Sequence, residues 1–107
     1  FYSGSKGCPV EIFLNTIRDE KLKVEALKNI LELSTVRKNV QHPLSKYVTD
    51  GIYELRTKQQ SNIDRIFYFF VFGNKIILTN GYVKKLQKME QNEFEKAKKY
   101  RDEYLRR

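Results

Sequence analysis

The chain has 107 residues, 40% of them hydrophobic, and 21 Lys/Arg against 13 Asp/Glu give it a formal net charge of +8. This length excludes two independent cores, so we expect residues 1–107 to form a single domain, with a native N-terminus truncated before Phe1. The charge favours an anionic partner, and no apolar run approaches the ~18 residues that a membrane span requires, so no membrane partner is expected. One cysteine, Cys8, excludes an intrachain disulfide and fits a reducing, cytoplasmic setting.

The first third of the chain predicts two helices. Residues 1–7 are typical of the end of a strand that runs into a turn, and Pro9 suits the first position of a helix. Apolar residues then recur with the spacing of one buried helical face: Val10, Phe13, Leu14 and Ile17. A second helix is expected over about residues 20–34, with its apolar side formed by Val24, Leu27, Ile30, Leu31 and Ser34.

The remainder predicts a sheet and a final helix. Residues 35–50, which include His42-Pro43, are expected to be a loop. Strands are expected over 52–57, 63–72 and 75–79, with a tight turn at Gly73-Asn74. A basic segment, 80–88, should lead to a helix over about 91–106, although a start near Met89 is equally consistent. Its apolar side would carry Phe94, Ala97, Tyr104 and Leu105.

These elements predict an α+β fold. Two N-terminal helices should pack on an antiparallel sheet of three or more strands, with a C-terminal helix beside the sheet. Both faces of the 63–72 segment are apolar beyond residue 66, so this strand is expected to be central and covered on both sides.

Several kinds of catalytic site are absent from the sequence. No His/Cys/Asp cluster could hold a metal, and no glycine-rich loop could cradle a phosphate, so no metal and no cofactor are expected. His42 is the only histidine, which excludes a ribonuclease that uses a histidine pair. RNA can still be cut when its own 2′-hydroxyl attacks the adjacent phosphate and fixed positive charge stabilises the developing oxyanion.

The second half of the chain supplies that positive charge. Residues 54–107 carry thirteen Lys/Arg against seven Asp/Glu, and we expect an anion-binding surface there without a matching set of acids. Arginine offers a planar fork for phosphate, whereas lysine offers a point charge. The candidate residues are Arg56 and Arg65 on neighbouring strands, then Tyr82, Lys84, Lys85 and Lys88 beyond the third strand.

Each candidate has a purely structural alternative. Arg65 could form a salt bridge with Glu54 or Asp64, and Arg56 could be an exposed strand residue paired with Glu54. The lysines could form an ordinary solvated face. Tyr82 could stack on a base or cover the core, and the sequence favours neither.

Three segments together resemble the toxins of the RelE/ParE superfamily, closest to its HigB-like branch. These are Gly-Ile-Tyr-Glu-Leu-Arg ending at Arg56, Arg-Ile-Phe-Tyr beginning at Arg65, and Gly-Tyr-Val-Lys-Lys-x-x-Lys ending at Lys88. The resemblance implies a RelE-like fold and the toxin of a type II toxin–antitoxin pair, which is a ribosome-dependent, metal-free endoribonuclease acting on mRNA. It assigns catalysis to Arg65, Arg56, Lys84 and Lys85, and RNA binding to Lys88 and Tyr82. The implied partners are the ribosome and a helix-turn-helix antitoxin.

Two other functions fit the same resemblance. The ParE branch shares the fold but inhibits DNA gyrase, and a basic nucleic-acid-binding protein without catalysis would carry the same charges. The cluster of arginines and lysines favours the nuclease.

Overall fold

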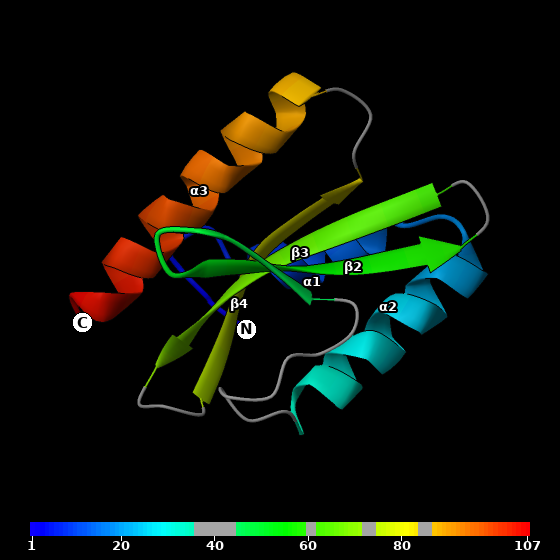
Figure 1. The fold of residues 1–107 in the computed structure, drawn as a ribbon, viewed down its shortest axis with the longest axis horizontal. Helices are drawn as coiled ribbons and strands as arrows, with labels where there is room; N and C mark the ends of the chain where they lie inside the picture. The colour runs from blue at the N-terminus through cyan, green and yellow to red at the C-terminus, as the bar shows by residue number, and fades with distance from the viewer. Residues whose placement is uncertain (36–44, 60–61, 72–74, 84–86) are drawn as a thin grey trace.

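A computed structural model describes residues 1–35, 45–59, 62–71, 75–83 and 87–107 (Figure 1). Helices α1 and α2 precede four strands and helix α3. Their bounds are Pro9–Thr16 for α1, Glu20–Leu33 for α2, Ser45–Thr49 for β1, Ile52–Gln59 for β2, Asn62–Val71 for β3, Lys75–Val83 for β4 and Gln87–Leu105 for α3. The strands form one antiparallel sheet in the order β1-β2-β3-β4, which confirms the predicted α+β fold.

The sheet is covered on both faces. On one face, α1 packs mainly on β4 and α2 on β2, around a core that includes Leu55, Ile66 and Leu78. On the other face, α3 packs on β3 and β4 through Phe94 and Ala97. Figure 1 shows α2 and α3 on opposite sides of the strands. The prediction that the 63–72 strand is central and covered on both sides is confirmed.

Local sequence explains where the two N-terminal helices begin. Pro9 occupies the first turn of α1, as predicted. Backbone N–H groups in the first turn have no partner within the helix, so the N–H that proline lacks is not needed there. Asp19 caps α2, since its carboxylate accepts hydrogen bonds from the N–H groups of Lys21 and Leu22. The predicted buried face of the first helix is confirmed, because Val10, Phe13, Leu14 and Ile17 are all buried.

The predicted apolar side of the second helix is wrong for Val24, Leu27, Leu31 and Ser34, whereas Ile30 does pack partly against the core. Val24 is 57% exposed, Leu27 41% and Leu31 70%. The face of α2 that packs on the sheet consists instead of Leu22, Ala26, Asn29 and Leu33. The helix therefore has two apolar stripes, and spacing alone cannot tell which of them meets the sheet.

Several boundaries also differ from the prediction. Part of the expected loop at 35–50 is strand β1, a short edge strand that pairs with β2, while His42-Pro43 lies outside the described residues. Strand β4 continues to Val83, because residues expected in a basic connecting segment pair with β3. The C-terminal helix begins at Gln87, earlier than either start considered, and Leu105 is exposed rather than part of its apolar side. The turn at Gly73-Asn74 lies outside the described residues, but pairing of Val71 with Lys75 confirms the hairpin.

The N-terminal residues contain a tight turn but no strand of the sheet. Gly4 and Gly7 form an isolated bridge, and the N–H of Tyr2 donates to the Leu78 carbonyl of β4 over 2.8 Å. The Tyr2 ring is buried and stacks on Tyr100 of α3, with ring centroids 4.8 Å apart. This segment therefore ties α3 to the edge of the sheet.

A bulge in β4 allows α1 to approach the sheet closely. The register between β3 and β4 shifts between the pairs Ile66–Gly81 and Tyr68–Leu78, so that β4 has one extra residue there. Gly81 consequently faces α1, and a Cβ atom placed on it would lie 2.4 Å from the Phe13 ring and 3.1 Å from Ile66. Only a residue without a side chain fits at this point.

We predict that Gly81→Ala lowers the free energy of unfolding by about 1–3 kcal/mol, the usual cost of overpacking a core. The cost should shrink in a Phe13→Leu background, because a smaller side chain makes room for the added methyl group. Urea unfolding of the four chains in this double-mutant cycle measures the coupling. An unchanged cost in the Phe13→Leu background would mean that the Phe13 ring is not what Gly81 accommodates.

Candidate functional site

Three candidate residues form one row across the sheet. Arg56 of β2 pairs directly with Arg65 of β3, and Arg65 pairs directly with Tyr82 of β4. Directly paired residues of antiparallel strands share a face of the sheet. Tyr82 packs with Phe94 of α3, so this row lies on the face that α3 covers.

A single carboxylate holds the two arginines together. Like charges directly opposite each other destabilise a strand pair. Glu54 lies two residues before Arg56 on β2, on the same face of the sheet and opposite Phe67, and its side chain is only 2% exposed. Its Oε1 atom accepts a hydrogen bond from Arg56 Nε over 2.8 Å and lies 3.5 Å from Arg65 Nη1. The Glu54 salt bridge considered for each arginine is therefore present.

Helix α3 brings a second carboxylate to Arg65. Glu90, in the first turn of α3, accepts a hydrogen bond from Arg65 Nη1 at 3.1 Å. The Arg65 side chain is 10% exposed, the Glu90 side chain 37%, and the Arg56 side chain 41%. The expectation that this surface has no matching acids is wrong, because two glutamates neutralise the arginine pair. Arg65 Nε is also buried and has no hydrogen-bond partner among the described residues.

Tyr82 belongs to the core rather than to an open surface. It is 4% exposed and stacks on Phe67, with ring centroids 5.7 Å apart. Burial, then the carboxylates of Glu54 and Glu90, raise the pKa of Tyr82 to about 12. Arg65 opposes this shift weakly, without a hydrogen bond of normal geometry to the hydroxyl. The structure thus favours the core-covering alternative for the ring, since no free face is left for a base.

The three candidate lysines cannot be placed in the same way. Lys84 and Lys85 lie outside the described residues, as does the side chain of Lys88. The described residues on either side of this segment nonetheless lie close to the arginine pair. Val83, the end of β4, pairs with Asp64, and α3, which begins at Gln87, carries Glu90 to Arg65.

The β4 bulge also fixes α3 near this row. Asn80 donates through Nδ2 to both the carbonyl and the Oε2 atom of Glu93 in α3, each over 3.0 Å. The Thr79 hydroxyl donates to Asn80 Oδ1 at 2.8 Å.

Sequence reasoning missed Glu90, Glu93 and the role of Asn80. An acid in the first turn of a helix was the available signal for Glu90, because it is favoured there by the helix dipole.

A buried acid lies directly beneath the arginine pair. Asp64 precedes Arg65 and so faces the opposite side of the sheet, where it is completely buried, opposite Thr57 and Val83. The Thr57 hydroxyl accepts a hydrogen bond from Asn29 Nδ2 of α2 at 2.9 Å. Neither carboxylate oxygen of Asp64 has a hydrogen bond of normal geometry among the described residues. Burial raises the pKa of Asp64 to about 7, and the nearby Thr57 hydroxyl lowers it only slightly.

A family comparison identifies the chain. The model for phage-derived Gp49-like proteins (DUF891) matches residues 16–102. The chain belongs to this family. The Gp49-like proteins are a family of RelE-like toxins, which confirms the broader part of the resemblance seen in the sequence. The match covers all four strands and the two arginines.

No curated protein matches the chain. Within the described part of this Gp49-like chain, no three His, Cys, Asp or Glu side chains gather as a metal ion would require. None of the described helices is long and apolar enough to cross a membrane.

We predict that the buried Asp64 makes stability fall as pH rises. The unfolded carboxyl releases its proton near pH 4, whereas the folded one keeps it to about pH 7. The Asp64 carboxyl therefore contributes its full share of the free energy of unfolding below pH ~4 and loses it by pH ~7. The loss is about 4 kcal/mol at most. Asp64→Asn, which cannot titrate, should gain stability relative to the native chain as pH rises from 5 to 8.

Urea unfolding of both chains across this pH range measures the effect. Glu11→Gln removes an exposed carboxylate of α1 and serves as the control, whose difference from the native chain should stay flat. A constant difference between Asp64→Asn and the native chain would show that Asp64 does not titrate in this window.

Proposed function

We propose that this Gp49-like protein is the toxin of a type II toxin–antitoxin pair and an endoribonuclease that cuts mRNA on the ribosome. The observation that carries this proposal is the direct pairing of Arg56 with Arg65. Two arginines opposite each other are unfavourable for the sheet alone, and their pairing therefore suggests a function that uses both.

The proposed reaction uses the RNA's own 2′-hydroxyl. The hydroxyl gives up its proton as its oxygen attacks the adjacent phosphorus and forms a new P–O bond. The bond to the 5′-oxygen of the next nucleotide breaks and that oxygen takes up a proton, which leaves a 2′,3′-cyclic phosphate and a 5′-hydroxyl. Negative charge builds up on the phosphate oxygens during this step, and fixed cations stabilise it. We assign this role to Arg65 and Arg56, supported by Lys84 and Lys85, with Lys88 binding the RNA backbone. Tyr82, which is paired with Arg65 on the neighbouring strand, packs beside it on the same face of the sheet.

This proposal requires Glu90 to leave Arg65. The two side chains are bonded at 3.1 Å, and Glu90 is the more exposed of the two carboxylates on Arg65. A phosphate that takes the Arg65 guanidinium must displace the Glu90 carboxylate, while Glu54 can stay in place and hold both arginines. Glu90 therefore competes with RNA within the same molecule.

The chemistry also points to partners. A basic nuclease that acts on ribosome-bound mRNA must be held inactive in its own cell, so we propose a cognate helix-turn-helix antitoxin and a cytoplasmic location. The net charge of +8 would speed association with the ribosome or with an acidic antitoxin. The second candidate, a nucleic-acid-binding protein without catalysis, is favoured by the pairing of both arginines with acids.

We predict that Arg65→Ala abolishes growth arrest on induction. Loss of one group that stabilises transition-state charge costs about 10²–10³ in rate. Arg65→Lys keeps the charge but loses the planar fork, and should retain a small part of the activity. Mapping of mRNA 5′ ends with translating ribosomes separates cleavage from simple binding. Arg106→Ala, at an exposed arginine of the C-terminus, is the control and should remain active.

Circular dichroism shows whether these variants fold. A folded Arg65→Ala chain that still cuts mRNA at the native rate would rule out Arg65 as the catalytic cation. Arrest without new mRNA ends, lost in Arg65→Ala, would instead favour the non-catalytic candidate.

We predict that Glu90→Gln strengthens RNA binding. A partly exposed ion pair is worth up to ~1 kcal/mol, so the gain should be about threefold to fivefold beyond any general charge effect. Glu95→Gln makes the same change in net charge on an exposed residue of the same helix and is the control, because the partners of Glu95 among the described residues, Gln91 and Lys98, both belong to α3. Fluorescence anisotropy with a short single-stranded RNA at low salt measures both. The excess gain should vanish when Arg65→Ala is added, and equal gains for the two variants would mean that Glu90 does not compete for Arg65.

A further inference from the structure

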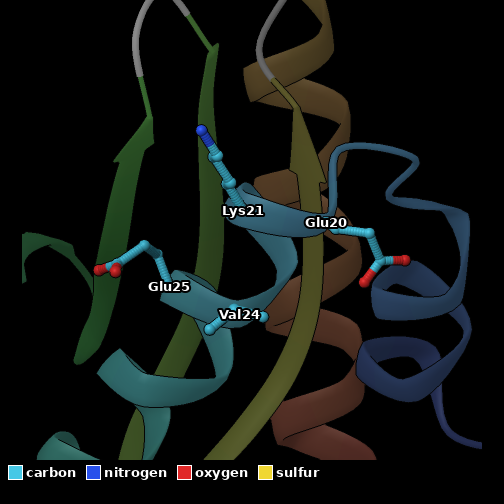
Figure 2. Close-up of a pocket in the computed structure, with 4 residues that line it drawn as sticks. All are labelled: Glu20, Lys21, Val24 and Glu25. Carbon is cyan, nitrogen blue, oxygen red and sulfur yellow. The ribbon is translucent and has the colours of Figure 1, made fainter.

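Helix α2 has a second apolar stripe that nothing in the described structure covers. Val24, Leu27 and Leu31 are 57%, 41% and 70% exposed, and they recur at i, i+3 and i+7. The residues that pack on the sheet lie on the opposite side of the helix. Figure 2 shows the start of this stripe, where Glu20 and Glu25 extend to opposite sides of Val24. A hollow of about 340 Å³ lies at this point.

The spacing of the stripe matches the seam of a two-helix pair. In a coiled coil, apolar residues at positions a and d form the contact, and positions e and g flank it. With Val24 at a, Leu27 falls at d and Leu31 at the next a. The sheet-facing residues Leu22, Ala26, Asn29 and Leu33 then fall only at positions c and f. The helix can therefore bind the sheet and another helix at once.

Three of the four residues that flank this seam are lysines, and the fourth, Ile30 at g, is partly buried against the core. Lys21 and Lys28 fall at e and Lys23 at g, and none of their ammonium groups makes an ion pair with a described residue. A second copy of this chain would bring lysine to lysine in either orientation. Parallel pairing joins g with e, and antiparallel pairing joins e with e and g with g. Like charges at these positions oppose self-pairing.

We propose that the outer stripe of α2 docks an amphipathic helix of another protein, one with acidic residues on both sides of its apolar seam. The apolar contact supplies the attraction, and the three lysines select an acidic partner over a basic one or a second copy. The surface uses neither Arg56 nor Arg65. It therefore stands whether or not the proposed nuclease activity is correct, and a partner bound here would leave the arginine pair uncovered.

The test uses the full 107-residue chain and a fluorescein-labelled synthetic peptide of three heptads, with leucine at a and d and glutamate at e and g. A matched peptide carries lysine at e and g. We expect the acidic peptide to bind at least tenfold more tightly than the basic one. Leu27→Ser combined with Leu31→Ser should weaken that binding at least tenfold without a change in charge. Ile12→Ser, at a 55% exposed apolar residue of α1, is the matched control and should have no effect.

Each other outcome overturns the proposal. Equal binding of the two peptides would remove the selection by lysine. Binding that survives the change at Leu27 and Leu31 would place the peptide elsewhere, for example on the arginine pair, and no binding at all would remove the docking site. Analytical ultracentrifugation of the chain alone tests whether a second copy of the chain occupies the stripe instead. A dimer that dissociates on the same double change would make a second copy the partner.

Discussion

The candidate site depends on one interaction, the contact of the Glu54 carboxylate with both Arg56 and Arg65. This carboxylate lies almost fully buried between two arginines that the sheet register places directly opposite each other. An unpaired buried carboxylate and two unpaired facing guanidinium groups would each be costly. Together they satisfy one another, and the unusual pair becomes compatible with a stable sheet. Any function assigned to Arg56 and Arg65 has to operate with this carboxylate in place.

Helix α3 supplies the second carboxylate that contacts Arg65. The helix is fixed to β4 through the bonds between Asn80 and Glu93, and to the N-terminal segment through the stacked rings of Tyr2 and Tyr100. This anchoring brings Glu90 onto Arg65, 25 residues away in the chain. The same helix that covers the core therefore also decides how accessible Arg65 is.

The two faces of the central strand divide the chemistry of the site. Arg65 faces α3 and is surrounded by carboxylates, whereas Asp64, its neighbour in sequence, faces α2 and has no cation among its described partners. A one-residue shift of register would exchange these environments and place a bare arginine in the apolar core. The hydrogen bond between Asn29 and Thr57 and the tight fit of Gly81 against Phe13 both oppose such a shift.

The sequence by itself determined much of this protein: the α+β class, the core face of α1, the central strand and the joint presence of Arg56 and Arg65. These follow from periodicity and β-propensity, which are local properties of the chain. Contacts between distant segments decided the rest. Pairing with a neighbouring strand made β1 a strand and extended β4 to Val83, and docking of α3 added Glu90 to the site. Helix α2 shows the reason most clearly, because both its stripes are apolar and helical periodicity describes them equally well. Only the sheet, by burying Leu22 and Leu33, left Val24, Leu27 and Leu31 facing outward.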